Sequence, residues 1–487
     1  MCSSFTSTML RMVFLLPLIS LLLASCAVGP NYHTPSVASP DAFRDSPSAA
    51  STNSLADLPW WGVFKNRTLQ NLIQTALTNN YDLRIAISRV EQARYLQRQV
   101  QSAFLPQVGY VGEADRGKNV VLGLPTPNSG TLNSYVGAFD VLWEIDLWGR
   151  IRRQNEAARA GLLASREAQR GIRLTLLSEV ASAYIQLLEL DERLEIAQRT
   201  AESFERTFKL FDVQHENGFT SKLELSRASG ALHSVSATIP DLRRQIAIKE
   251  NEINVLLGRN PGPVSREKSM LNQEALPEVP TGLPAMLLQR RPDIREAEQE
   301  LRIANAEIGV TVGDFFPKIG LTALYGGVST ELSALTSGGA NAWSLAATTT
   351  GPIFQGGRLK ARYRQAVAAR DEAKLGYQRT ALNAFREVAD ALVSRQQLEE
   401  GRREQAEAVD AYRAAVEVSN DRYRAGKASY YEVLEAQQQL FPAENALSQI
   451  EASQRLVMVQ FYKALGGGWN LNDLQWTGAQ ASGNRPP

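Results

Sequence analysis

The most constraining feature of this chain is an internal duplication. Residues 149–258 and 357–466 follow the same pattern, offset by 208 positions. A spacing this long exceeds the period of about 20–50 residues that marks a solenoid repeat. The sequence therefore predicts two half-molecules, each with a complete set of elements. The repeated pairs are Gly149-Arg150 with Gly357-Arg358, Gly218 with Gly426, Ser221 and Glu224 with Ser429 and Glu432, and Gly258 with Gly466.

The N-terminus predicts export and a lipid anchor. Arg11 precedes an apolar run over residues 13–23, which is too short to span a bilayer and is typical of a signal peptide. Leu23-Ala24-Ser25-Cys26 resembles a bacterial lipobox, so we expect residues 1–25 to be removed and Cys26 to be acylated. The alternative is an ordinary secretory signal beside a chance cysteine. The only other cysteine, Cys2, lies in the segment to be removed, so no disulfide is expected.

Residues 26–59 are rich in Pro, Ser and Ala, and they predict an acylated, extended tether without a core of its own. The first structural repeat then covers 60–258. Apolar residues at helical spacing extend to Leu77 and, after a break at two asparagines, resume from Asp82 to about Phe104. Past Cys26 there is no run of eighteen apolar residues, so no membrane helix is expected.

Residues 107–147 change to the alternating period of paired strands. In the second strand Tyr, Phe, Val, Trp and Ile occupy odd positions, whereas even positions include Asp140, Glu144 and Asp146. Alternation over more than ten residues matches a tilted membrane strand, with the apolar face toward lipid and the carboxylates toward a lumen. The alternative is a pair of soluble hairpins. Residues 318–354 repeat the pattern.

A helical stretch without proline runs from Arg150 to about Gln214 and, at ~1.5 Å per residue, would reach about 100 Å. Asn217-Gly218 predicts a left-handed cap, and Ser221 with Glu224 predicts a capping box that starts a return helix, so a helical hairpin spans about 150–258. The apolar residues of the long helix step by three and four, as in a coiled-coil seam: Leu177, Val180, Tyr184, Leu187, Leu190, Leu194, Ala197, Ala201, Phe204, Phe208 and Phe211.

The second repeat is expected over 284–469, after a linker at 259–283. Its helical hairpin covers about 358–465, and Gly426 with Ser429 and Glu432 predicts the same turn. A tail follows at 470–487. Where the first seam has Leu194, Ala197 and Phe211, the second long helix has Arg402, Gln405 and Ser419, which predicts a face toward water or a movable contact.

Four strands per chain cannot close a barrel, and open strand edges are not tolerated in lipid. The strands must therefore be pooled between chains, as eight in a dimer, twelve in a trimer or sixteen in a tetramer. Helices of this length also need neighbours. The predicted fold class is a mixed α and β membrane protein, in which a shared transmembrane β-barrel continues into a long α-helical barrel.

A series of short motifs resembles the TolC-type outer-membrane factors, specifically the NodT/OprM-like lipoprotein branch that serves resistance-nodulation-division (RND) efflux systems. The resemblance covers nearly the whole chain from Cys26 to Trp469. It implies a homotrimer with a twelve-stranded barrel in outer-membrane lipid and a periplasmic helical barrel. It also implies docking to a periplasmic adaptor protein and an inner-membrane RND transporter, as a passive gated exit duct for drugs or other small molecules. The motifs are VGPNY from Val28, WWGVF from Trp60, DLWGR from Asp146, RRPDI from Arg290, FFPKI from Phe315, GPIFQGGR from Gly351 and YKALGGGW from Tyr462.

The resemblance places functions at the hairpin turns. Family members receive the adaptor near this end, so docking is expected at Gly218-Phe219-Thr220-Ser221 and Gly426-Lys427-Ala428-Ser429; alternatively, these are only stable turns. Relatives constrict the tube just before the second turn, which places a periplasmic gate at Val416, Asn420, Asp421, Arg422 and Arg424. Asn420 stands where a ring acid is expected, and Asp421 with Arg422 or Arg424 is equally interpreted as an exposed ion pair.

Neither catalysis nor nucleic-acid binding is indicated. The formal charge is +1, without the basic excess of a nucleic-acid groove. His33, His215 and His233 lack metal-ligand spacing, and Gly466–Gly468 lacks the Lys-Ser/Thr of a phosphate loop, so no enzyme activity, cofactor or metal is expected. Two other functions stay open. One is the outer-membrane duct of a type I protein secretion system; the other is a lipid-anchored periplasmic scaffold, which would need no aromatic-banded strands.

Overall fold

The computed structural model describes residues 27–40, 43, 66–117, 131–266 and 284–467. Cys26, the predicted signal peptide, the motif from Trp60 and the tail after 469 lie outside the described residues. The chain divides into two compact units, which we describe separately. The first comprises Met1–Ser36, Arg89–Arg166 and Glu296–Gln378, and the second comprises Val37–Ser88, Glu167–Arg295 and Arg379–Pro487.

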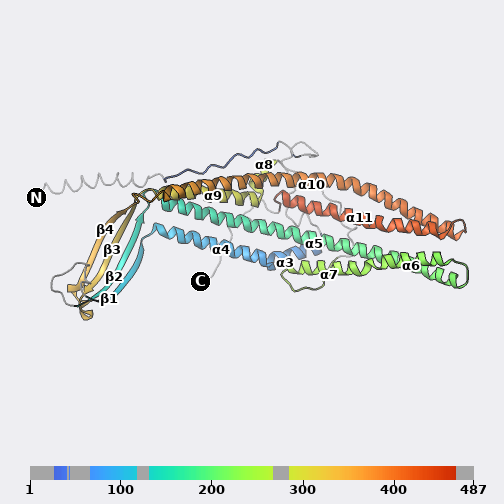
Figure 1. Ribbon diagram of the computed structural model, residues 1–487, viewed down its shortest axis with the longest axis horizontal. Coiled ribbons are helices and arrows are strands. Elements are labelled where there is room, and N and C mark those ends of the chain that lie inside the picture. The colour runs from blue at the N-terminus through green and yellow to red at the C-terminus, as the bar shows by residue number, and fades with distance from the viewer. Residues whose placement is uncertain (1–26, 41–42, 44–65, 118–130, 267–283, 468–487) are drawn as a thin grey trace. The chain divides into compact units, whose positions relative to one another are not determined.

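The first unit contains a single four-stranded sheet, seen with its strands side by side in Figure 1. All neighbours are antiparallel, and the spatial order β1-β2-β3-β4 follows the sequence. Each repeat contributes two strands, as predicted. The strands are β1 (Gln107–Gly117), β2 (Leu132–Ile145), β3 (Lys318–Ser329) and β4 (Asn341–Thr350).

The two repeats contain the same series of helices. In each, a short helix and a longer one precede the strands, and a helix of 67 residues follows them; at ~1.5 Å per residue this helix is about 100 Å long. No helix within the described residues contains a stretch apolar enough to cross a membrane. The helices are α3 (Arg67–Asn79), α4 (Tyr81–Gln101), α5 (Arg150–Glu216), α6 (Lys222–Ser236), α7 (Thr238–Leu256), α8 (Pro284–Arg290), α9 (Pro292–Gly313), α10 (Arg358–Arg424) and α11 (Tyr430–Ala464).

The repeats differ in the return helix. We expected one continuous helix from about Ser221 to Leu257, but the structure divides it into α6 and α7 at Ala237. Pro240 explains the break, because proline has no N–H to donate to the carbonyl four residues earlier and its ring crowds that carbonyl. In the second repeat α11 accommodates Pro442 and continues.

Glycines end the helices in the same way in both repeats. Gly218, Gly258, Gly426 and Gly466 all have φ between 67° and 75°, a region that only glycine enters without strain. At Gly218 the amide donates to His215 O at 3.0 Å, and the next amide donates to Gln214 O at 2.8 Å. The same pair of bonds recurs at the other three glycines, which defines a Schellman motif at each.

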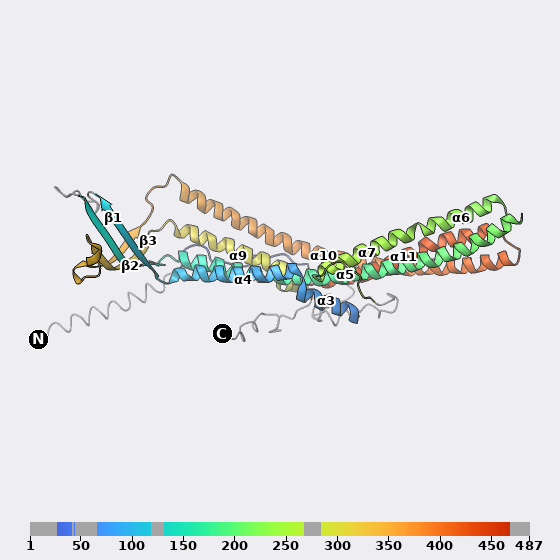
Figure 2. The ribbon, with the colours of Figure 1, turned by 90° about the horizontal axis from the view of Figure 1, so that it is seen from below.

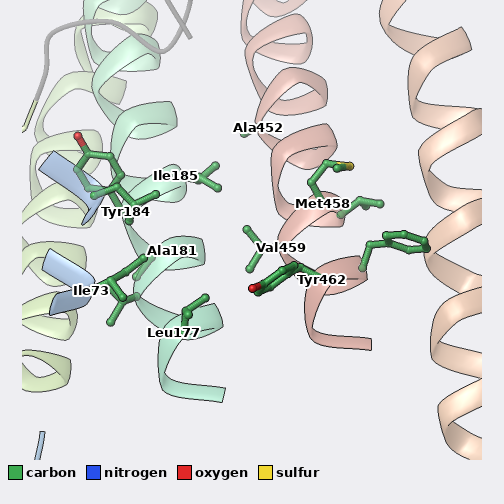
Figure 3. Packing of buried hydrophobic residues seen from close by; sticks show 14 of the residues in the cluster. Ile73, Leu177, Ala181, Tyr184, Ile185, Ala452, Met458, Val459 and Tyr462 are labelled. Carbon is green, nitrogen blue, oxygen red and sulfur yellow. The ribbon is translucent and has the colours of Figure 1, made fainter. Parts of the chain in front are cut away.

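The core of the second unit lies between α3, α5 and α11. Figure 3 shows Ile73 beside Ala181, and Ile185 with Val459 and Tyr462 in the space between α5 and α11. The seam predicted for the long helix is confirmed, since Val180, Tyr184 and Leu187 are fully buried. Burial raises the pKa of Tyr462, so its hydroxyl stays neutral.

A second apolar cluster joins the hairpin ends, where α6, α11 and the end of α5 lie side by side in Figure 2. Phe211 of α5 meets Tyr430 of α11 edge-to-face at 4.5 Å between ring centroids, and Tyr423 of α10 contacts the same ring at 5.4 Å. Burial raises the pKa of Tyr430 to about 12. The two hairpins are therefore held together by aromatic packing close to their turns.

Candidate functional site

The sheet has one aromatic face. Strand pairing places Tyr110 opposite Phe139, Phe139 opposite Tyr325, and Tyr325 opposite Trp343, so one aromatic side chain from each strand lies in a single row. Their exposed fractions are 84%, 65%, 64% and 74%. Direct opposition puts residues on the same face of a sheet. Such a row is typical of the girdle that a membrane strand presents at a lipid interface.

The opposite face carries the polar residues. Asp140 lies on this face between Gly109 and Leu324, and its carboxylate covers the glycine, where an added Cβ would lie 2.7 Å from Oδ1. Glu144 shares the face, and Lys318 begins β3 on it. The alternation predicted for β2 is thus observed, with Asp140 and Glu144 opposite the aromatic row.

Asp146 departs from the prediction that it is a third carboxylate of the strand face. β2 ends at Ile145, and Asp146 instead caps α5. Its carboxylate accepts hydrogen bonds from the backbone amides of Ile151 at 3.0 Å and Arg152 at 2.9 Å. These amides belong to the first turn of a helix, which has no internal acceptors for them. Asp146 therefore joins strand to helix rather than lining the strand.

We expect Asp146→Ala to lower the free energy of unfolding by about 1–2 kcal/mol, because two helix amides lose their acceptor. Asp146→Asn, which keeps one acceptor oxygen, should cost less. Thermal unfolding in detergent, followed by circular dichroism, would measure both. Equal melting temperatures for the parent and Asp146→Ala would contradict this role.

The chain just after residue 26 is held against helices of the first unit. Arg153, only 4% exposed, donates to the carbonyls of Val28 and Gly29 and to Asn31 Oδ1, at 3.1, 3.3 and 2.8 Å. The amide of Val28 donates to Trp148 O at 3.0 Å. Further along, the Arg302 guanidinium lies 4.7 Å from the centre of the Tyr32 ring. Residues 28–31 of the predicted tether are therefore fixed beside the start of α5.

The first hairpin turn has the predicted capping chemistry. The Ser221 hydroxyl accepts from the Glu224 amide at 3.2 Å, and the Ser221 amide donates to Glu224 Oε2 at 2.9 Å. The bond from the Ser221 amide lowers the pKa of Glu224. His215 Nδ1 lies 2.8 Å from Thr220 O and closes the turn from inside. Phe219 is 84% exposed at the tip, so its large apolar side chain is not buried against the described residues.

The second turn differs from the prediction. α11 begins at Tyr430 with Ser429 as its N-cap, as expected, but the Ser429 side chain makes no capping hydrogen bond. The Glu432 carboxylate lies 3.4 Å from Arg422 Nε instead. The Glu432 carboxylate pairs with Arg422 of α10 and not with the N-cap amide, so the capping box is absent. Lys427, between the two helices, is exposed.

The predicted gate residues do not share one face of α10. Ser419 is buried, so of the two alternatives predicted for its position, water or a movable contact, it does not face water within the single chain. Asn420 is half-buried and donates from Nδ2 to Val416 O at 2.8 Å, so its amide serves its own helix. Asp421 and Arg424 have side chains 73% and 77% exposed and lie 3.8 Å apart.

Glu417 was not among the gate residues predicted from the sequence. It is exposed one turn before Asp421, so the two carboxylates lie on the same exposed face of α10. The spacing of four residues between Glu417 and Asp421 could have predicted that they share a face of the helix.

A buried carboxylate joins three helices above the turns. Glu444 of α11, with a side chain 7% exposed, accepts from Arg199 of α5 at 3.0 Å and from Arg413 of α10 at 2.9 Å. Breaking a buried pair by removing one partner leaves an uncompensated charge. The ends of α5 and α10 are thereby tied to the return helix of the second repeat.

Comparison with known proteins agrees with this geometry. The family model "Outer membrane efflux protein" matches twice, at residues 72–259 and 283–467. The chain is 34% identical to the probable efflux pump outer membrane protein TtgC of Pseudomonas putida, over 95% of this chain and 96% of that protein. It is 31% identical to the cation efflux system protein CusC of Escherichia coli, over 93% and 97% of the two chains.

Solved structures share the fold. The outer-membrane channel OprN superposes with a TM-score of 0.83 at 32% identity, covering 91% of this chain and all of that one. The double family match coincides with the duplication, and the four strands and long helices match the architecture of the channel. The chain therefore belongs to the outer membrane efflux protein family and is the outer-membrane channel of an efflux system, not an enzyme.

Proposed function

We propose that this channel is the exit duct of a tripartite RND-type pump and that it works as a homotrimer. The observation that carries the proposal is the four-stranded sheet with an aromatic face, whose outer edges on β1 and β4 pair with no other strand of the described residues. Open edges are not tolerated in lipid, so other copies must pair with them. Three copies supply twelve strands, enough for a closed barrel with an aqueous lumen.

The helices supply the rest of the duct. Two helices of 67 residues per chain would give six in a trimer, each about 100 Å long, and α10 is exposed along much of its length in the single chain. We assign these helices to the periplasm. The cargo is proposed to be a drug, solvent or other small molecule, since the similar proteins TtgC and ArpC of Pseudomonas putida are outer membrane proteins of a toluene and an antibiotic efflux pump.

The hairpin turns are the proposed contact with the adaptor protein, and through it with the inner-membrane transporter. The exposed side chains of Phe219 and Lys427 at the two tips support this assignment, because neither side chain is buried against the described residues. Gly218, Thr220 and Ser221 shape the first turn, and Gly426, Ala428 and Ser429 shape the second. We place the resting gate just above them, with Glu417 and Asp421 toward the lumen and Arg424 beside them. Val416, Asn420 and Arg422 then support the gate from within the chain.

The oligomer and the channel can be tested together. Native mass spectrometry of the detergent-extracted protein should give a trimer, and the same sample in a planar bilayer should give discrete conductance steps. An adaptor protein should raise the conductance. A monomer or dimer as the sole species would refute the trimer, and a trimer without conductance would leave the scaffold interpretation in its place.

We further propose that residues 1–25 are a signal peptide and that Cys26 carries the lipid. The structure fixes Ala27 next to Gly149, where an added Cβ would lie 2.6 Å from Ala27 Cα, close to the end of β2. This position supports an anchor at the membrane surface. The segments 26–59, 259–283 and 470–487 keep their proposed roles as tether, linker and tail.

Cys26→Ser, exported through an unlipidated signal, should still form trimers in the outer membrane, because the strands anchor the protein without the acyl chains. Mass spectrometry of the N-terminal peptide would check the loss of lipid, and membrane fractionation would check the trimer. If the unlipidated protein stayed soluble and monomeric, the strands would not be membrane strands.

A further inference from the structure

The two repeats differ in charge where a strand passes into a long helix. The offset of 208 aligns residues 143–156 with residues 351–364. The first segment contains three arginines and three carboxylates, so its formal charge is zero. The second contains four cations and no acid, so its formal charge is +4. The carboxylates Glu144 and Asp146 are replaced by Pro352 and Phe354.

In the first repeat every cation of this junction is neutralised within the chain. Arg150 Nη2 lies 2.8 Å from Glu144 Oε2, Arg152 Nε lies 3.2 Å from Asp146 Oδ2, and Arg153 Nη1 lies 2.7 Å from Glu156 Oε2. The charges of this junction are therefore balanced within the chain, without any outside partner.

In the second repeat most of the cations lack a carboxylate. Among the described residues, the Arg358 guanidinium donates only to the neutral side-chain amide oxygen of Gln355, at 2.5 Å from Nη2. Arg362 instead pairs with Asp314 at 2.9 Å. Lys360 and Arg364 are exposed, and neither meets an acid among the described residues. Three positive charges at the start of α10 are thus left for a partner outside the described chain.

Two apolar side chains are exposed beside these cations. Ile353 and Phe354 have relative exposures of 103% and 88%, the largest of any apolar residues within the described parts of the chain. They follow β4 directly, since that strand ends at Thr350. An unpaired cation cluster next to exposed apolar residues is the composition of a segment that lies in a lipid interface.

We propose that residues 351–364, named here the junction segment, form a binding surface for anionic phospholipid in the periplasmic leaflet of the outer membrane. Ile353 and Phe354 enter the edge of the acyl region, while Arg358, Lys360 and Arg364 bind the phosphate groups. Continuity with β4 places the segment at the membrane boundary. The inference rests on the proposed function in one respect, namely that the long helices lie in the periplasm.

A neighbouring copy of the chain is the competing occupant, and charge argues against it. In residues 143–156 of the first repeat all three carboxylates form ion pairs within the same chain, so this segment has no unpaired acid for a neighbouring copy. Anionic phospholipid supplies both what the charge requires, in its phosphate groups, and the apolar layer, in its acyl chains.

The test compares lipid retention by native mass spectrometry. Full-length protein is equilibrated with equal amounts of phosphatidylglycerol and phosphatidylethanolamine, and the ratio of the two lipids bound per trimer is measured. The combined variant Arg358→Gln, Lys360→Gln and Arg364→Gln should lower the phosphatidylglycerol preference about threefold or more. The control Arg386→Gln with Arg403→Gln removes exposed charge farther along α10 and should leave the preference unchanged.

Each outcome decides the proposal. An unchanged preference in the junction variant, or an equal fall in the control, would overturn it. If the junction variant instead dissociated into monomers, the occupant would be a second copy of the chain. The single variant Phe354→Ser checks that conclusion. It should bind less of both lipids yet stay trimeric if the occupant is lipid, and it should also dissociate if the occupant is a second copy. Conductance of the parent is measured in parallel, so that failure of the channel function is seen separately from failure of lipid binding.

Discussion

Aspartate in place of Val141 should prevent assembly of the membrane sheet, whereas leucine in place of Asp140 should be tolerated. The two residues are adjacent in β2, but the pairing register puts them on opposite faces. Val141 lies opposite Val108 and Ala323 on the aromatic face. A carboxylate on the lipid face lowers the stability of the membrane sheet by up to a few kcal/mol per chain near the midplane. In a closed oligomer every copy carries the substitution, so the loss is repeated in each chain.

Asp140→Leu removes a charge without burying one. The carboxylate has no ion-pair partner among the described residues, and its neighbour Gly109 leaves room for a larger side chain. The measurement is the fraction of folded oligomer in the outer membrane, read by its resistance to dissociation on unheated gels. Val141→Leu provides the control for a change of size alone. Similar yields for Val141→Asp and Asp140→Leu would show that the faces are assigned in the wrong order.

The glycine turns and the strand faces were predictable from the sequence because each depends on local chemistry. A helix that ends with a residue of positive φ favours glycine at that position, and Gly218 and Gly426 recur there at a fixed offset. The alternation of apolar and acidic residues in β2 follows from the two-residue period of a strand, in which successive side chains point to opposite faces. The break at Ala237 was also predictable, because Pro240 lies just after it, but the predicted return helix ran past this proline.

The exact role of single polar side chains was not predictable in the same way. Glu432 has the spacing of a capping box, but a cation on another helix competes for it, and only the packing of α10 against α11 brings Arg422 within 3.4 Å. Asp146 continues the alternation of β2, but the strand ends one residue earlier and the start of α5 takes the carboxylate. Asn420 aligned with an expected ring acid, whereas its amide bonds back to Val416.

The two faces of α10 differ within the predicted gate. The face of α10 with Val416, Ser419 and Asn420 turns at least partly inward, and Ser419 is buried. The exposed face presents Glu417 and Asp421, one turn apart, with Arg424 at 3.8 Å from Asp421. An exposed ion pair of this length contributes little to stability. Three copies of two carboxylates brought to one axis would instead act on ions, attracting cations and repelling anions.

Glu417→Ala combined with Asp421→Ala should therefore raise the single-channel conductance about twofold or more and weaken the cation preference, because the constricting ring loses both bulk and charge. Reversal potentials in a salt gradient measure the preference, and cells without the pump should become more sensitive to large antibiotics. Asp410→Ala removes an exposed acid three turns above on the same helix and should change neither quantity. Asn420→Ala alone should also have little effect, since its amide serves the backbone of α10. If the double variant matched the parent in conductance and ion preference, the constriction would lie elsewhere, and Glu417 and Asp421 would be ordinary surface acids.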